Sequence, residues 1–438
     1  MNLLSLIHQR PHIFFGWWIV SLAGFLNSIN SSAYNKGYVI FLLPVTEGLG
    51  VSRAAISLVF SMSRSEGGPI GPVAGWLIDR FGPRPVMFVG TLLSGTGFLL
   101  LSQTDNIWTF GLVYLGMITF GSDLAFSNSL FALINNWFHR RRAVAMSSYH
   151  AISSLGPSLL VPILALLIAT QGWRTGAMVA GFTILAVALP LTLLVRSTPE
   201  SAGLLPDGGV AQPPAKRQNQ DSEQEALARE VKPTDFAMAE ALHTSSYWLL
   251  LMGTVLRVTA KAGVMLHIIP IMVWKGNDQQ TAAFIFGLYL FLTVPLSLFF
   301  GWLADTLPKN WVLFTAAVSG TTAFFLLASP LRSLWILYLF VLLLAIAETN
   351  GSNNWATIGD YFGRKAYGRL KGIIQLASSP WVFLAPVFAG WWYDRVESYT
   401  LLLWVFTIFF SLGALSFALM RKPKLVQRPE EVAVSASA

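Results

Sequence analysis

The chain has no cysteine, and only 11% of its 438 residues are charged. The absence of cysteine excludes disulfide bonds and thiolate metal sites. Soluble domains carry about 25% charged residues, so this sequence is too poor in charge to be one. Hydrophobic residues instead make up 54% of the chain, and its mean hydropathy is +0.58. This composition is that of a protein embedded in a lipid bilayer.

The few charges that remain are mostly basic, with a formal net charge of +8 and a pI near 9.7. They cluster in short loops between apolar segments, which is how membrane topology is encoded, and we therefore exclude nucleic acid as a partner. The sequence also lacks a phosphate-binding Walker loop and clustered metal ligands. We expect no cofactor, no bound metal and no enzymatic activity.

Twelve apolar segments are long enough to cross the hydrocarbon core, which needs about 20 residues. Their approximate bounds are 14–44, 54–79, 85–103, 107–136, 141–170, 173–196, 245–273, 280–305, 310–330, 333–360, 367–393 and 399–421. The sequence predicts an all-α membrane protein with six-helix bundles in residues 1–196 and 244–425. The polar segment 197–243 cannot bury enough apolar surface to fold alone. We predict that it is a largely disordered cytoplasmic linker and that 426–438 is a disordered tail.

The loops alternate between basic and nearly neutral. The basic ones hold Arg80 and Arg84, 139–142, the central linker, Lys309, 364–371 and 421–424. Because basic loops stay in the cytoplasm, we expect both termini there, in a multi-pass protein of the cell (inner) membrane.

The two halves repeat each other. GWLIDRFGPR at Gly75 to Arg84 returns as GWLADTLPKN at Gly301 to Asn310, 226 residues later, and INNWFHRRRAVA aligns with IGDYFGRKAYGR at an offset near 224. Hydrophobicity does not dictate charged loop residues, so these matches indicate a duplication with two pseudo-symmetric bundles. Such repeats place a substrate site near the bilayer midplane and transport by rocking one half against the other.

The first of these segments has the form G-x-x-x-D-R-x-G-x-R, and through it the whole chain resembles the major facilitator superfamily. The resemblance implies a gating motif between the second and third helices. An aspartate and an arginine at helix ends can cap them and bridge neighbours, and so favour closure of one face. The motif residues are Gly75, Asp79, Arg80, Gly82 and Arg84, with Asp305 in the second copy. Thr306 replaces the second arginine, which predicts a weaker latch there.

A narrower resemblance is to the monocarboxylate transporter branch, whose pattern the oxalate and formate antiporters share. It is carried by FFGWW at Phe14 to Trp18 and by WFHRRRAVAMSSYHAISSLG at Trp137 to Gly156. The resemblance implies a role for Lys36 in proton and carboxylate handling. The Asp and Arg pair of that branch's eighth helix is replaced by Thr293 and Ser297, so another cation must bind a carboxylate here.

Charged residues near the middle of the spans are costly and usually functional or paired. They are Arg64 and Glu66 in the second span, Asp123 in the fourth, Arg257 and Lys261 in the seventh, and Glu348 in the tenth. Arginine binds carboxylates bidentately, so we predict that Arg257 binds the substrate and that Arg64 assists or holds the gate. The alternative is that every charge is paired internally and only stabilises the fold.

Polar residues at helical spacing predict a hydrophilic path. Four stripes occur: Asn27, Asn30, Ser31 and Tyr34; His150, Ser153 and Ser154; Asn350, Asn353 and Asn354; and Gln375, Ser378 and Ser379. Amides also hold helices together, so each stripe taken alone is compatible with packing as well as with lining.

Proton coupling needs a group that titrates in the working range. The candidates are Lys36, Asp123, His150, Lys261, His267 and Glu348, because histidine titrates near neutral pH and burial raises carboxyl pKa values. The sequence therefore predicts a secondary active transporter of a small organic anion, working by alternating access and coupled to a proton or counter-ion. A drug or organic-cation exporter of the same fold and a non-transporting membrane sensor are the alternatives.

Overall fold

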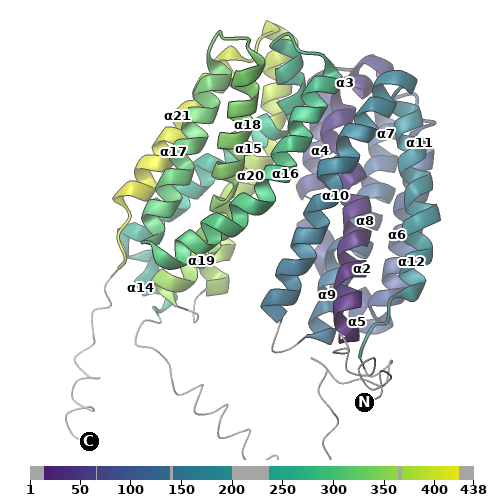
Figure 1. Ribbon diagram of the computed structural model, residues 1–438, viewed down its shortest axis with the longest axis horizontal. Helices are drawn as coiled ribbons and strands as arrows, with labels where there is room; N and C mark the ends of the chain where they lie inside the picture. The colour runs from purple at the N-terminus through teal and green to yellow at the C-terminus, as the bar shows by residue number, and fades with distance from the viewer. Residues whose placement is uncertain (1–13, 66, 139–141, 200–235, 364–366, 424–438) are drawn as a thin grey trace, which may run out of the picture. The chain divides into compact units, whose positions relative to one another are not determined.

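The computed structural model describes residues 14–65, 67–138, 142–199, 236–363 and 367–423 (Figure 1). Within these ranges the chain is helical and contains no β-strand. It divides into two compact units. Unit 1 comprises Met1–Pro213 and Asp278–Phe291, and unit 2 comprises Pro214–Asn277 and Leu292–Ala438.

Unit 1 is built from long helices, several of which contain π-helical turns. In chain order they are α2 (Phe15–Asn30), η1 (Ser31–Asn35), α3 (Tyr38–Leu49), α4 (Arg53–Ser65), α5 (Gly67–Phe81), α6 (Pro83–Leu101), α7 (Ile107–Val113), η2 (Tyr114–Thr119), α8 (Phe120–Ser122), η3 (Asp123–Asn128), α9 (Ser129–Trp137), α10 (Arg142–Gln171), α11 (Trp173–Thr183), η4 (Ile184–Ala188) and α12 (Leu189–Leu194).

Side-chain hydroxyls accompany two of the π-helical turns. Thr119 Oγ1 donates to Tyr114 O at 2.9 Å, and Ser129 Oγ donates to Leu124 O at 2.6 Å, each five residues back. These bonds match the π-helical spacing of five residues. Such turns are frequent at functional sites, and Asp123 begins one of them.

Close approach between α6 and α8 depends on paired glycines. A Cβ at Gly90 would lie 2.7 Å from the carbonyl oxygen of Gly121, and a Cβ at Gly121 would lie 2.6 Å from that of Gly90. Only residues without a side chain allow this backbone contact, which is how small residues bring membrane helices together.

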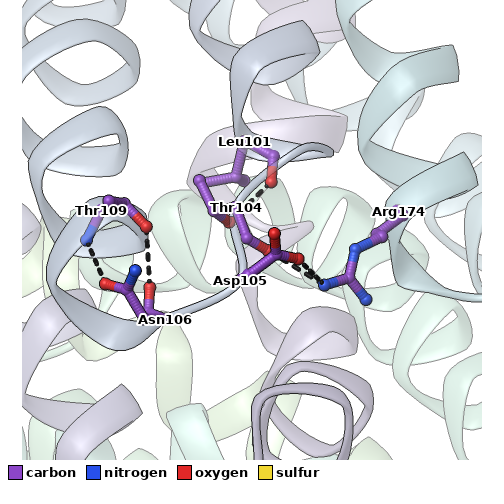
Figure 2. A network of polar contacts seen from close by, with 6 residues as sticks. All are labelled: Leu101, Thr104, Asp105, Asn106, Thr109 and Arg174. Carbon is purple, nitrogen blue, oxygen red and sulfur yellow. Dashed lines mark hydrogen bonds and ion pairs between the residues drawn. The ribbon is translucent and has the colours of Figure 1, made fainter.

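The loop between α6 and α7 is tied to the start of α11. Arg174 Nη2 donates to Asp105 Oδ1 at 2.9 Å and to Thr104 O at 3.0 Å, while Asn106 Oδ1 caps α7 by accepting from Thr109 N at 2.9 Å (Figure 2). These contacts hold the loop against the first turn of α11.

Unit 2 contains α14 (Met238–Leu242), α15 (Ser245–Trp274), the second half of α16 (Gln279–Thr306), α17 (Lys309–Ala328), α18 (Leu334–Glu348), α19 (Asn350–Phe362), α20 (Tyr367–Val396) and α21 (Thr400–Leu419) (Figure 1). Helix α14 falls inside the segment expected to be a linker. It is ordered because Phe236 and Ala241 are buried in an apolar cluster with Tyr247 and Phe362. Residues 200–235 of that linker and 424–438 of the tail lie outside the described residues.

Ten helices in the described ranges are long and apolar enough to cross a membrane. The segments expected to be the first and second spans are not among them as single helices. The first is interrupted between η1 and α3, and the second includes Glu66, which lies outside the described residues. The count of twelve therefore stays a prediction.

Candidate functional site

One face of α15 carries the polar residues of unit 2. Thr254, Arg257 and Lys261 are spaced i, i+3 and i+7, which places them along one side of the helix. Two of the three bond across to α18 and α19. Thr254 Oγ1 donates to Asn354 Oδ1 at 2.8 Å, and Lys261 Nζ donates to Glu348 Oε1 at 2.5 Å. Arg257 lies on α15 between these two cross-helix bonds.

Lys261 and Glu348 form an ion pair that is only partly buried. Their side chains are 29% and 26% exposed, respectively. An exposed fraction of this size at mid-span indicates that the pair borders open space rather than a sealed core. The spacing of these residues in the sequence did not reveal the pairing, because it depends on how α15 and α18 are rotated about their axes.

Arg257 differs from Lys261 because no acid among the described residues is hydrogen bonded to it. The side chain is 4% exposed, and its Nε has no hydrogen-bond partner within the described chain. Glu348 is close enough to act on it electrostatically but is hydrogen bonded to Lys261. Two cations thus share one carboxylate, which leaves one positive charge in excess at this site.

Asn354 adds a second unused donor. Its Oδ1 accepts from Thr254, while its Nδ2 is buried without a partner in the described residues. Unpaired buried donors are rare in proteins, and here two occur on groups that recognise oxygen anions. Thr254 was not among the expected site residues, although its position three residues before Arg257 is a signal that could have identified it.

The other amides of the tenth-span stripe bond to neighbouring backbone. Asn350 Nδ2 donates to Leu313 O at 3.0 Å, and Asn353 Nδ2 reaches Phe300 O at 3.5 Å. Both residues are buried. These are contacts that hold α19 against α17 and α16, so this stripe divides between packing and the Arg257 site.

The α20 stripe is also mixed. Gln375 is exposed, whereas Ser378 is buried and its Oγ donates a hydrogen bond to Ile374 O at 2.7 Å. Of this pair, Gln375 alone offers its side chain to an open space.

His267 is fully buried in unit 2 and both ring nitrogens are engaged. Nε2 lies 3.0 Å from Pro386 O, and Nδ1 lies 3.1 Å from Tyr399 Oη. A carbonyl can only accept, so Nε2 carries a proton and Nδ1 is left to the hydroxyl of Tyr399. This arrangement is that of a histidine that joins α15 to α20 and the start of α21.

In unit 1, Arg64 is bound by the first span. Its guanidinium donates to Asn35 Oδ1 at 3.1 Å and to Asn35 O at 3.0 Å, and it lies 4.8 Å from the centre of the Tyr38 ring. Asp123 is close enough to interact with it electrostatically. Asn35 and Tyr38 were not predicted, because their contact with Arg64 depends on the interruption between η1 and α3.

The remaining first-span residues are mainly buried. Asn30 is 1% exposed, and its Oδ1 accepts from Ser122 Oγ at 2.9 Å. Tyr34 is 3% exposed, and Ser31 O accepts from Lys36 N at 2.8 Å. Asn27 and the Lys36 side chain are half-buried. The stripe therefore turns largely into the bundle, with Asn27 at its more open end.

His150 is exposed on α10, in contrast to His267. Its ring lies 5.1 Å from that of Tyr149 and 5.9 Å from that of Phe131, centre to centre. Its side chain is therefore not enclosed by the neighbouring helices of unit 1.

The gating motif lies at the junction of α5 and α6. Gly82 has φ of +79°, which favours glycine, and it forms the turn. Arg84 Nη2 donates to Leu193 O at 2.6 Å, while exposed Arg80 lies 5.6 Å from the ring centre of Trp76. Gly75 is half-buried beside open space. The side chains of Asp79 and Asp305 fall outside the described part of the chain.

Unit 2 has an unpredicted ion pair near the second copy of this motif. Lys309, the first residue of α17, pairs with Asp360 near the end of α19. The pair joins two helices at the end of the bundle where the second copy of the motif lies.

Comparison with known proteins shows which families and folds this chain resembles. The family model of the Major Facilitator Superfamily matches residues 20–273 and 250–436. An uncharacterized MFS-type transporter of Bacillus subtilis, YcxA, is 28% identical over 187 residues, which are 42% of this chain and 45% of that protein. Monocarboxylate transporter 2 of Rattus norvegicus is 25% identical over 393 residues, or 88% of this chain and 79% of that protein.

Solved structures show the same fold. The crystal structure of a peptide transporter, POT, in complex with sulfate matches with a TM-score of 0.69 at 13% identity, covering 98% of this chain and 96% of that chain. At this identity the likeness concerns the fold alone.

Proposed function

Because the chain belongs to the Major Facilitator Superfamily and is a multi-pass transporter related to monocarboxylate transporters, we propose that it carries a small organic monoanion. Transport is secondary active and proceeds by alternating access, the mechanism of membrane bundles built from repeats. The substrate class is that of the monocarboxylates, which the name of the rat relative supplies and the chemistry of Arg257 supports.

The environment of Arg257 carries this proposal. A guanidinium that is 4% exposed and has an unbonded Nε has lost its water without gaining a full set of acceptors. Burying such a group costs folding free energy unless an anion accepts its remaining hydrogen bonds and neutralises its charge. A carboxylate fits because it accepts two parallel N–H bonds from arginine, and Asn354 Nδ2 is a further unused donor in the same unit.

The charge balance favours one negative charge on the substrate. Arg257 and Lys261 oppose Glu348, so a single carboxylate neutralises the group. An exporter of organic cations would be expected to show a surplus of acid, and the described mid-span charges of unit 2 have the opposite surplus.

Glu348 is the proton-binding group in this proposal. When it is protonated, its ion pair with Lys261 is lost and the site gains one unit of positive charge. An anion then binds more tightly, so a proton and a carboxylate favour each other's binding, as linkage requires. Arg64 serves unit 1 as a cation fixed by Asn35 and Tyr38, and it assists the substrate or holds the gate.

Uptake into proteoliposomes tests the substrate class. Labelled monocarboxylates of two to five carbons are offered with and without an inward proton gradient, and the gradient is expected to accelerate uptake. Losing a hydrogen bond to a charged group costs roughly 1.5–3 kcal/mol, so Arg257→Gln should lower uptake at limiting substrate by about 10- to 100-fold. Uptake by Arg257→Lys should lie between that of the wild type and that of Arg257→Gln. Lysine keeps the positive charge but cannot donate two parallel hydrogen bonds to a carboxylate.

The matched control is Arg395→Gln, which removes an exposed arginine at the end of α20 and should transport normally. Glu348→Gln should still bind substrate but lose the acceleration by the proton gradient. Normal uptake by Arg257→Gln, or binding of carboxylates with no flux in the wild type, would contradict the proposal; the second result is the one expected of a membrane sensor.

We place both termini on the cytoplasmic side of the cell membrane, from the distribution of basic loops. The absence of cysteine makes single-cysteine variants free of background. A membrane-impermeant maleimide should label Gln103→Cys in intact cells and Lys422→Cys only after permeabilisation. The reverse pattern would invert the topology.

A further inference from the structure

A cavity of about 280 Å³ opens at one end of unit 2, where α15 and α17 finish and α21 begins. Its lining includes Trp274, Lys275, Ser329, Arg332, Thr400 and Trp404. Lys275 is 18 residues beyond Arg257 on the same continuous stretch, or about 27 Å at 1.5 Å per residue. The cavity is thus separate from the Arg257 site.

Two cations and no acid line this cavity. Lys275 is 6% exposed, and its Nζ donates to the backbone oxygens of Ser329 and Leu331. These carbonyls satisfy hydrogen bonds but do not neutralise the charge, and within the described ranges neither Lys275 nor Arg332 is in an ion pair. Burial, and then the charge of Arg332, lower the pKa of Lys275.

Lys275 alone could be explained by packing, since its ammonium caps the C-terminus of α17. Arg332 has no such explanation. It is exposed in the loop after α17 and faces the same cavity as a second like charge. Two cations held together without an acid repel each other, and a bound anion reverses this repulsion.

The start of α21 adds to the positive potential. Thr400 is the first residue of this 20-residue helix and lines the cavity. The N-terminus of a helix carries the positive end of its dipole, and at this one Thr400 N donates to Ser398 Oγ at 3.2 Å. The cavity therefore combines two side-chain cations with a helix N-terminus.

The surroundings indicate that the cavity lies at the level of the lipid headgroups. Trp274 and Trp404 line it, and Trp335 and Leu331 nearby are 80% and 58% exposed. Tryptophan concentrates where the hydrocarbon core meets water. An anionic lipid that enters this site from the bilayer has an apolar part that these residues can contact.

We propose that this cavity binds the phosphate of an anionic membrane lipid. Lys275 and Arg332 contact the phosphate, and the tryptophans contact the glycerol and upper acyl region. Free inorganic phosphate shares the recognised chemistry and is the competing source.

Native mass spectrometry of the full chain tests the proposal. The protein is purified in micelles with equal amounts of phosphatidylglycerol and phosphatidylcholine, and the ratio of retained lipids is measured. The wild type should retain phosphatidylglycerol preferentially. The attraction of one basic residue to anionic lipid changes a binding constant by about fivefold. Arg332→Gln should therefore lower the preference for phosphatidylglycerol by about fivefold.

Arg395→Gln is the matched control, because it removes an exposed arginine close in sequence to the start of α21 but outside the cavity lining. It should keep the wild-type preference. Lys275→Gln provides a second variant, and 10 mM inorganic phosphate added without lipid should raise the unfolding temperature if a soluble anion is the natural occupant.

Phosphate stabilisation that Arg332→Gln abolishes would support the anion site and assign it to the soluble source. Equal lipid ratios in the wild type with no stabilisation by phosphate, or equal losses in Arg332→Gln and Arg395→Gln, would overturn the proposal. Uptake of monocarboxylates is measured separately, so neither result depends on the transport activity.

Discussion

Lys261 Nζ and Glu348 Oε1 lie 2.5 Å apart and join α15 to the last residue of α18. This pair satisfies one of the two cations on the face of α15 and leaves Arg257 as the surplus. Because about a quarter of each side chain is exposed, the pair is neither a surface bridge nor a sealed core contact. Glu348 also acts electrostatically on Arg257, and we propose that the energy of the pair is coupled to substrate binding there.

Removing one member of the pair should destabilise the protein more than removing both. Lys261→Gln leaves Glu348 without its hydrogen-bonded cation, although Arg257 still attracts it electrostatically, and Glu348→Gln leaves two adjacent cations with no acid between them. Fully buried pairs lose about 3–5 kcal/mol on such a change, and we expect roughly 1–3 kcal/mol here because solvent reaches both groups. Apparent unfolding temperatures in detergent give the comparison.

The double variant Lys261→Gln/Glu348→Gln should recover at least half of the larger single loss. Strict additivity of the two single effects would show that the groups do not interact energetically. It would also contradict the proposed coupling between this ion pair and substrate binding.

Added monocarboxylate should raise the unfolding temperature of the wild type and of Glu348→Gln but not that of Arg257→Gln.

The sequence predicts the class of fold and the positions of the mid-span charges. Length and hydropathy define the spans, and the repeated loops predict the two-bundle family, which the family match and the solved structures confirm. The spacing of Arg257 and Lys261 correctly places them on one face of α15, because local helix geometry alone sets that relationship.

The sequence could not decide which polar side chains line space and which pack. Asn350 and Asn354 lie four residues apart in one stripe, yet Asn350 Nδ2 donates to Leu313 O whereas Asn354 Nδ2 has no partner in the described residues. That outcome depends on the rotation of each helix about its axis, which neighbouring helices determine. The contacts of Arg64 with Asn35 likewise follow from a break in the first span that hydropathy does not show.

Thr254→Val should cost more stability than Thr259→Val. Both hydroxyls lie within hydrogen-bond distance of a carbonyl four residues back, at 2.6 Å and 2.7 Å, but only Thr254 Oγ1 also lies 2.8 Å from Asn354 Oδ1, and its single proton is shared between the two acceptors. Losing that bond leaves a buried amide oxygen unsatisfied, which costs about 1–3 kcal/mol. Comparing the thermal unfolding of the two variants isolates the contribution of the bond between Thr254 and Asn354. Equal shifts in unfolding temperature would contradict this prediction.

The contact between Asp105 and Arg174 (Figure 2) should contribute little through its charges. Asp105 is 85% exposed and Arg174 is 42% exposed, and exposed ion pairs are worth about 0.2–1 kcal/mol. Asp105→Asn should therefore change the unfolding temperature only slightly, and less in high salt. Arg174→Gln should cost more because it also removes the bond to Thr104 O and the contact with the Trp173 ring. Equal losses in the two variants would show that the carboxylate dominates.

Asp278 should make the start of α16 sensitive to acid. Its Oδ1 accepts from Thr281 N at 2.8 Å and its Oδ2 from Thr281 Oγ1 at 2.6 Å, and these bonds, the side-chain one first, lower its pKa. A carboxyl with a lowered pKa in the folded state stabilises that state above its unfolded pKa, near 4, and the contribution disappears as the pH falls through the folded value.

Asp278→Asn is the control for this effect, since asparagine caps helices about as well as aspartate and does not titrate. The wild type should match or exceed Asp278→Asn in unfolding temperature at pH 7 and fall below it as the pH approaches 3. Thr281→Val removes one of the two donors and should flatten this difference. Parallel curves for the wild type and Asp278→Asn between pH 3 and pH 7 would show that the carboxylate form is not preferred at this cap.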